Sequence, residues 1–168
     1  MKELSIKDVP SSLLANFDCG DEKLNLYLYS YAKQNEEKGV GRTFLLVNED
    51  AILGFYTLSS AQIAFNELPP ELNKRLPHYP IPAIRIARLG VSKDKQHQGI
   101  GSLLLKSAFK RIMTAFINVG ISFIIVEAKP QSKGFYEKYG FICIDEEKLL
   151  YVLSIFTVIK AIMGVNND

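Results

Sequence analysis

The stretch 88–104 constrains this chain more than any other part, because a polar turn there joins an apolar run to a glycine-opened helix. The run 83–91 predicts a strand, and the helix is expected to begin at the pair Gly99 and Gly101. A helix start leaves backbone N–H groups unpaired and carries partial positive charge, and glycines let a ligand come close to the backbone. The stretch therefore predicts an α/β protein with an anion site, suited to a phosphate, at the helix start.

The spacing of this turn separates several phosphate-binding loops. Gln96-x-x-Gly99-x-Gly101 lacks the third glycine of the dinucleotide-binding fingerprint and the Gly-Lys-Ser/Thr end of a P-loop. It matches the Gln/Arg-x-x-Gly-x-Gly/Ala pyrophosphate loop of the GNAT N-acetyltransferases, which hold acetyl-CoA. A second segment, Phe135-Tyr136-x-x-x-Gly140-Phe141, resembles the sequence that closes GNAT domains. The resemblance covers nearly the whole chain.

Resemblance to this family implies a fold and a set of site residues. The fold would be α/β (α+β): one GNAT domain over 1–168, with a mixed, splayed β-sheet flanked by helices on both faces. Tyr136 would be the general acid that protonates the leaving thiolate, and acetyl-CoA would be the co-substrate. The residues implied to bind it are, for pantetheine, Leu89, Gly90 and Val91, and, for the pyrophosphate, Gln96, His97, Gln98, Gly99, Ile100, Gly101 and Ser102.

Further segments resemble one branch of the family, the toxins of type II toxin–antitoxin modules. They are Phe17-Asp18-Cys19-Gly20, Tyr31-Ala32-x-Gln34, Gly41-Arg42-Thr43, Gly54-Phe55-Tyr56-Thr57-Leu58 and Arg88-Leu89-Gly90-Val91. Those toxins acetylate the α-amine of the amino acid on aminoacyl-tRNA and have antitoxins with a ribbon–helix–helix domain. The resemblance implies the same substrate and partner here, with a homodimer as the usual form. One departure is 130–133, Pro-Gln-Ser-Lys, which lacks the Asn or Asp often found before the tyrosine.

Composition and cysteine content limit the remaining classes. A chain of 168 residues fits one domain. No apolar run reaches the roughly 18 residues of a membrane span, and no signal peptide is recognisable, so neither a membrane nor secretion is expected. Cys19 and Cys143 show no metal-ligand spacing, so we expect no metal and a reduced cytoplasm.

Charge is distributed unevenly along the chain, although the net charge is only +2. The segment 74–111 contains nine basic residues and a single acid, Asp94. Such an excess indicates a polyanionic ligand on one face, which could be CoA together with a nucleic acid. A solvated helix face rich in lysine accounts for it equally well.

The acceptor amine must be neutral to attack a thioester. A lysine ε-amine has a pKa near 10.4 and generally needs a base, whereas an α-amine near 7.7–8.0 is partly neutral already. No carboxylate lies within 83–91, and Glu127 is the one acid placed to act as a base, unless it is solvated or paired. His97 and His78 are predicted to be loop residues. Weak provision of a base therefore favours an acceptor of low pKa.

Hydrophobic periodicity and turn residues predict the other elements. A helix capped by Asp18 or Asp21 should bury Leu24, Leu28 and Tyr31. The long helix 99–118 should bury Leu103, Leu104, Ala108, Ile112 and Phe116. A change of phase along 83–91 predicts a β-bulge at Ala87-Arg88. The proline-rich stretch 66–82 is predicted to be a substrate-facing loop. Strands are expected at 2–7, 43–47, 52–60, 121–126, 141–144 and 149–155, and shorter helices at 70–76, 131–140 and 158–163.

Two other functions remain open at this stage. A GNAT enzyme could acetylate a small-molecule amine or a protein N-terminus, because one fold supports many acceptors. A non-catalytic acyl-CoA-binding regulatory module is the second alternative.

Overall fold

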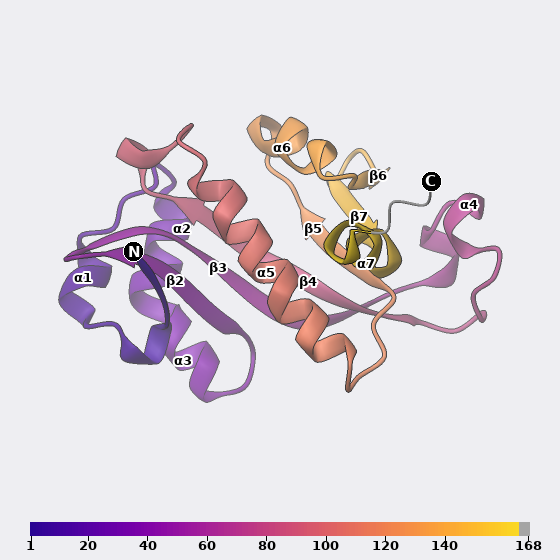
Figure 1. Ribbon diagram of the computed structural model, residues 1–168, viewed down its shortest axis with the longest axis horizontal. Helices are drawn as coiled ribbons and strands as arrows, with labels where there is room; N and C mark the ends of the chain where they lie inside the picture. Colours follow the sequence, from indigo (N-terminus) through magenta and orange to yellow (C-terminus); the bar gives the residue numbers. More distant parts are fainter. Residues whose placement is uncertain (165–168) are drawn as a thin grey trace. The chain divides into compact units, whose positions relative to one another are not determined.

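A computed structural model describes residues 1–164 (Figure 1). Within them, seven strands form one mixed sheet in the order β1-β2-β3-β4-β5-β7-β6, as the α/β prediction requires. The strands are β1 Lys2–Ser5, β2 Arg42–Asn48, β3 Ala51–Ile63, β4 Ile81–Val91, β5 Phe123–Glu127, β6 Ile142–Asp145 and β7 Leu150–Ser154. The α-helices are α1 Ser11–Ala15, α2 Glu22–Leu26, α3 Ala32–Glu37, α4 Pro70–Asn73, α5 Ile100–Phe116, α6 Lys133–Lys138 and α7 Ile155–Met163.

The chain is divided into two compact units. The first comprises Met1–Ser59 and Ile86–Lys110, and the second comprises Ser60–Arg85 and the chain from Arg111 onward. Strands β3 and β4 and helix α5 each contribute residues to both units. The expectation of one domain over 1–168 stays a prediction.

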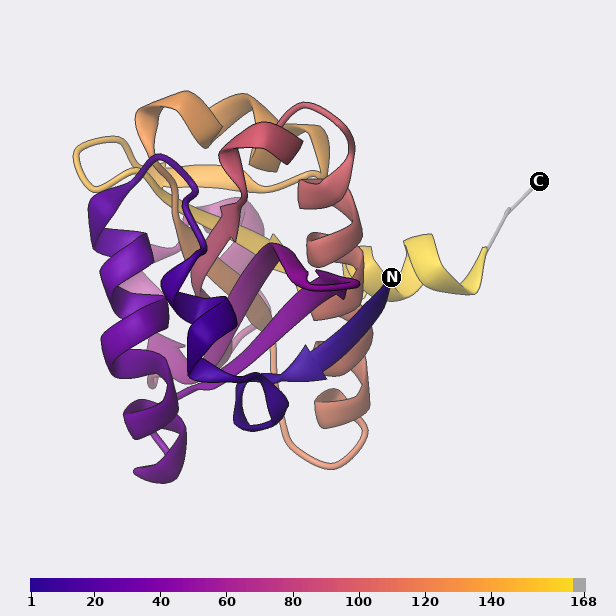
Figure 2. The ribbon, with the colours of Figure 1, turned by 90° about the vertical axis from the view of Figure 1, so that its left-hand side faces the viewer.

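Strands β1, β2 and β3 of the first unit separate two apolar layers. β1 pairs antiparallel with β2 at the edge of the sheet, and β2 pairs antiparallel with β3. Because side chains alternate along a strand, Leu45 and Val47 join one cluster with Leu28, whereas Phe44 and Leu46 pack with Leu104 of α5. Helices therefore cover both faces of these strands, as predicted (Figure 2).

The helical segment after Asp21 departs from regular α geometry. The Asp21 carboxylate caps α2 by accepting from the N–H groups of Lys23 and Leu24, at 2.9 and 3.1 Å. A π-helical segment, Tyr27–Tyr31, then connects α2 to α3, and the N–H of Ala32 donates to the carbonyl of Tyr27 five residues back. The wider turn moves later side chains round the axis. Ala32 is consequently buried and Tyr31 is 49% exposed, so the prediction of a buried Tyr31 is wrong.

Helix α5 buries Leu104, Ala108 and Ile112 as predicted. Leu103 is 43% exposed and Leu105 is fully buried instead, so the prediction for Leu103 is wrong. These two leucines flank Leu104 at about 100° to either side, and periodicity alone does not decide which side packs on the sheet. The helix ends at Phe116, which is half-buried.

The predicted parallel pairing of β4 with β5 lies in the second unit. β4 and β5 pair in parallel from Ala83 opposite Phe123 to Arg85 opposite Ile125. β7 lies antiparallel to both β5 and β6. Helix α7 is longer than the predicted 158–163, and the Ser154 side chain caps it by accepting from the Phe156 N–H.

Buried positions change parity along β4. Ile81 and Ala83 are buried at odd positions, whereas Ile86 and Gly90 are buried at even ones. The change lies before Ile86 and runs from odd to even positions, whereas the sequence pattern places it after Ile86 and from even to odd, with Leu89 and Val91 in fact half-buried. The bulge at Ala87-Arg88 stays a prediction.

Two other features bear on function. Across residues 1–164, no helix is long and apolar enough to cross a bilayer. In the same range, no group of three or more His, Cys, Asp and Glu side chains is placed to hold a metal ion.

Candidate active site

The predicted phosphate turn lies in the first unit, between the end of β4 and the start of α5. Its first residues are fixed by backbone bonds: the N–H of Ser92 donates to Leu53 O at 2.8 Å, and that of Lys93 donates to Asp18 O at 2.9 Å. A 3-10 turn follows at Lys93–Lys95. His97 (φ 61°) and Gly99 (φ 85°) adopt left-handed conformations, which turn the chain into the helix. Gly99 has no Cβ and adopts this conformation without steric cost. His97 has a side chain and adopts a conformation that is uncommon for such residues.

The start of α5 has the features that an anion requires. The helix is seventeen residues long, so its dipole places partial positive charge at Ile100 and Gly101. The first N–H groups of a helix point out of its N-terminal end. Gln98 and Gly99 are exposed, and Ile100, Gly101 and Ser102 are half-buried. The residues predicted to bind the pyrophosphate, 96–102, thus form one continuous, accessible turn at this helix end.

Strand β3 lies close to helix α5 and to the end of β4, and these contacts explain why glycine occupies positions 54 and 90. A Cβ on Gly54 would lie 2.8 Å from Gly90 O and 2.7 Å from Leu104 Cδ1, and a Cβ on Gly90 would lie 3.0 Å from Phe55 Cε1. Both distances at Gly54 are shorter than real Cβ contacts allow. Glycine at this position therefore determines how closely β3 approaches 89–91, the backbone predicted to contact pantetheine.

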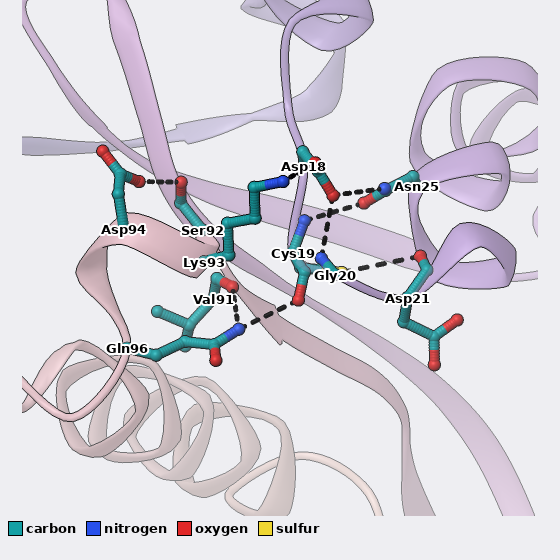
Figure 3. A network of polar contacts seen from close by, with 10 residues as sticks. All are labelled: Asp18, Cys19, Gly20, Asp21, Asn25, Val91, Ser92, Lys93, Asp94 and Gln96. Atoms are coloured by element: carbon teal, nitrogen blue, oxygen red, sulfur yellow. Dashed lines mark hydrogen bonds and ion pairs between the residues drawn. The ribbon is translucent and has the colours of Figure 1, made fainter.

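The Gln96 side chain has a structural role that its motif does not specify. Its Nε2 donates to Cys19 O at 2.9 Å and to Val91 O at 3.0 Å (Figure 3). An amide carries two donor hydrogens, and these two carbonyls take both. The side chain therefore presents only an acceptor to a phosphate, and the backbone N–H is the donor that Gln96 can offer. Gln96 joins the phosphate turn to the loop that precedes α2.

Asp18 organises the other side of this network (Figure 3). Its carboxylate accepts from Lys93 Nζ at 2.7 Å, Gly20 N at 2.8 Å and Asn25 Nδ2 at 2.9 Å. The hydrogen bond from Lys93, followed by those from Gly20 and Asn25, holds the pKa of Asp18 well below its usual range. The same pairing raises the pKa of Lys93. Asp18 is thus an anchor between the loop and the turn, and Asp21 is the helix cap.

A cavity of about 300 Å³ lies beside this network in the first unit. Its lining includes Phe17, Asp18, Ser92 and Lys93, but none of the residues predicted to bind acetyl-CoA. Asp18 partly neutralises the charge of Lys93 there. This cavity is therefore less favourable to an anion than the start of α5, where no acidic residue of the first turn opposes the helix dipole.

Tyr136 lies on α6 in the second unit. It is only 5% exposed, and its ring packs edge-on against Phe135 and Phe141 at centroid distances of 5.1 and 5.4 Å. Phe135 and Tyr139 are half-buried, so Tyr136 is the most buried of these three helix residues. Burial raises the pKa of Tyr136 to about 12, since a phenolate is poorly solvated there. The hydroxyl therefore keeps its proton at neutral and moderately alkaline pH.

The other titratable candidates are accounted for within their own units. Glu127 accepts from Arg85 at 3.2 Å in a partly exposed ion pair, which is the paired alternative considered above. His78 stacks on Phe65 in the loop between β3 and β4. His97 belongs to the turn, as predicted. Sequence reasoning did not identify Asn25, whose side chain donates to the Asp18 carboxylate and accepts from the Cys19 N–H. The one signal that could have found it is its position in the first turn after the Asp21 cap.

These features first define a class. The strand end held close to its neighbour by glycine, the turn with two left-handed residues and the accessible start of a long helix are features of α/β proteins with a site suited to a phosphorylated ligand. The family follows from comparison with known proteins. The chain belongs to the GNAT acetyltransferases, because a family model described as an acetyltransferase (GNAT) domain matches residues 19–150.

Known proteins similar to this chain include toxins. It is 31% identical, over 129 residues, to the tRNA-acetylating toxin of Mycobacterium tuberculosis, covering 76% of this chain and 77% of that protein. A crystal structure of a tyrosine-to-phenylalanine mutant of KacT matches with a TM-score of 0.89 at 30% identity, covering 95% of this chain and 98% of that one. These similarities confirm the GNAT fold.

Solved relatives also hold ligands. AtaT complexed with acetyl-methionyl-tRNAfMet is 27% identical and matches with a TM-score of 0.86, covering 96% of this chain and 98% of that one. AtaTR bound with acetyl-CoA is 28% identical and matches with a TM-score of 0.81, covering 96% and 97%. GNAT toxins of this structure therefore bind acetyl-CoA as their co-substrate.

Proposed function

We propose that this chain transfers the acetyl group of acetyl-CoA to the α-amine of the amino acid on aminoacyl-tRNA, and thereby blocks its use in translation. The observation that carries the proposal is similarity over nearly the full length to AtaT, which was solved with an acetylated, charged tRNA. The tRNA-acetylating relative supports the same acceptor.

Binding of acetyl-CoA is proposed to rest on backbone groups in the first unit. The N–H groups at the start of α5 and in 96–102 would hold the pyrophosphate, because they carry partial positive charge and are accessible. The strand end Leu89, Gly90 and Val91 would offer backbone to pantetheine and polarise the thioester carbonyl, which stabilises developing negative charge on its oxygen. The side chains of Gln96 and Asp18 act as positioning groups, since they hold the turn and do not face it as donors.

The transfer itself needs an acid. The acceptor nitrogen attacks the thioester carbon, the carbon–sulfur bond breaks, and the amine loses a proton to solvent. Tyr136 is proposed to hydrogen-bond the developing thiolate and to donate its proton to the sulfur, regaining one from solvent. A hydroxyl whose pKa is about 12 is always protonated at physiological pH. Its buried position strengthens a hydrogen bond to developing charge.

The state of Glu127 supports an acceptor of low pKa. This carboxylate already accepts from Arg85 and is 59% exposed, so it is poorly suited to deprotonate an ammonium group. An α-amine with a pKa of about 7.7–8.0 is partly neutral at pH 7.5 without a base. A protein N-terminus shares this property, but the tRNA-acetylating relative and the tRNA-bound AtaT favour the aminoacyl ester.

The same relatives support a proposal about a partner. AtaT has also been solved, as a mutant, bound to the C-terminus of its antitoxin AtaR, with 24% identity to this chain. We propose that this chain has an antitoxin of the ribbon–helix–helix type, forms a homodimer and acts in the cytoplasm, where charged tRNA is available.

A competition among acceptors tests the proposal. The protein is incubated with ¹⁴C-acetyl-CoA and, separately, with total charged tRNA, deacylated tRNA, polyamines and peptides with free N-termini. Label on the charged tRNA alone is expected, released as N-acetyl amino acid by mild alkali. Label on polyamines or peptides with none on tRNA would refute the acceptor, and acetyl-CoA binding without any transfer would favour the regulatory module.

A further inference from the structure

The loop between β3 and β4 presents aromatic and basic side chains on an ordered support. Phe65 and His78 lie stacked, with ring centroids 4.1 Å apart and an interplanar angle of 21°. Tyr79, the next residue, is 64% exposed. All of these residues belong to the second unit.

The loop is held in place by its own contacts. The Asn73 side chain donates to Phe65 O and to Leu68 O, both at 3.1 Å. Leu68 is buried in the core of the second unit, and Leu72 and Leu76 pack against that core. Pro77 and Pro80 bracket the pair His78 and Tyr79, and proline fixes the backbone φ angle. The exposed rings are therefore ordered before any ligand arrives, which lowers the entropic cost of binding.

Charge points to the kind of ligand. Lys74 and Arg75 are exposed in the same segment as Tyr79; the acids of this loop, Glu67 and Glu71, precede them, and no acid occurs between 72 and 84. Aromatic rings combined with lysine and arginine are the means by which proteins bind unpaired nucleotides: bases stack on the rings and phosphates meet the cations. Paired bases are already stacked inside a duplex, so a platform of this kind selects single strands.

We propose that Tyr79, with the Phe65–His78 stack and the cations Lys74 and Arg75, forms a stacking platform for the unpaired nucleotides at the 3′ end of the charged tRNA. The inference rests on the proposed function, since it assigns part of that substrate to a surface. The platform gives a role to the proline-rich stretch 66–82, which contains none of the residues predicted to bind acetyl-CoA.

Steady-state kinetics of full-length Tyr79→Ala test the platform. Loss of one stacked base is expected to lower kcat/KM for charged tRNA about tenfold, mainly through KM. Tyr79→Phe should restore it, because the ring remains. The matched control is Tyr29→Ala, a similarly exposed tyrosine (58%) of the first unit, which should leave kcat/KM unchanged. An unchanged KM in Tyr79→Ala, or the same decline with an aminoacyl methyl ester as acceptor, would overturn the proposal.

Direct binding separates this inference from the proposed function. A fluorescein-labelled single-stranded RNA ending in CCA is titrated with wild type and with Tyr79→Ala, and anisotropy is measured. Weaker binding by the variant supports the platform even if wild type acetylates no charged tRNA, a result that would refute only the proposed function. In Lys74→Gln/Arg75→Gln the slope of log K against log salt should fall by about 1.4, near 0.7 per phosphate contact. Equal binding by wild type and Tyr79→Ala would refute the platform whatever the activity.

Discussion

Replacing Gln96 with methionine would test whether the side-chain hydrogen bonds of Gln96 hold the phosphate turn in place. Methionine has a similar length but no amide, so the hydrogen bonds to Cys19 O and Val91 O, at 2.9 and 3.0 Å, are both lost. At about 1 kcal/mol per bond, the unfolding free energy should fall by about 2 kcal/mol. For a chain of this size, that corresponds to a Tm lower by about 4–8 °C.

Affinity for acetyl-CoA should fall as well. Once the turn is released, the ligand must order it, at a cost of up to the same 2 kcal/mol, so the dissociation constant should rise roughly 10- to 30-fold. Isothermal titration calorimetry and a thermal melt measure the two effects. Gln62→Met, an exposed glutamine of β3 in the second unit, is the control and should change neither. If Gln96→Met binds acetyl-CoA as tightly as wild type, the positioning role assigned to Gln96 is refuted.

Two further predictions concern packing and pH. Gly54→Ala should lower the unfolding free energy by about 1–3 kcal/mol and weaken acetyl-CoA binding, because its Cβ would lie 2.8 Å from Gly90 O. Gly134→Ala on α6 has nothing within 4 Å of its Cβ and should be neutral or slightly stabilising in the same melt, whereas equal stability of both variants would contradict the close approach. Initial rates with charged tRNA should rise with pH through about 8, as the acceptor α-amine deprotonates, and then stay level to pH 10. The burial that raises the pKa of Tyr136 to about 12 keeps its hydroxyl protonated over this range, so a decline with a midpoint below pH 10 would exclude it as the acid.

Local chemistry explains why much of the site could be predicted. Gly99 and Gly101 mark the start of α5 because glycine accommodates left-handed and closely approached backbone, and the structure has Gly99 at φ 85°. Asp21 is a helix cap by residue type and position. The parallel pairing of β4 with β5 follows from the strand–helix–strand order. Each of these signals lies within a few residues of the feature that it predicts.

The failures come from features that the local sequence pattern does not reveal. Tyr31 is exposed because a π turn at 27–31 shifts the helix register. The hydrophobic periodicity of the sequence does not indicate such a turn. Leu103 and Leu105 differ only in which side of Leu104 meets the sheet. The Gln96 side chain donates to the carbonyl of Cys19, which lies 77 residues earlier in the chain, and the sequence did not predict this role. No local pattern identifies such a partner.

The central claim is acetyl transfer to charged tRNA with Tyr136 as the acid, and one assay tests it most directly. Transfer of label from ¹⁴C-acetyl-CoA to total charged tRNA is measured for wild type and for Tyr136→Phe, with acetyl-CoA binding measured in parallel. Removing only the hydroxyl should lower the rate by about 10²- to 10⁴-fold, the usual contribution of general acid catalysis, while acetyl-CoA binding stays within about twofold. Undiminished transfer by Tyr136→Phe would contradict the mechanism, and the absence of label on charged tRNA with active wild-type protein would contradict the function.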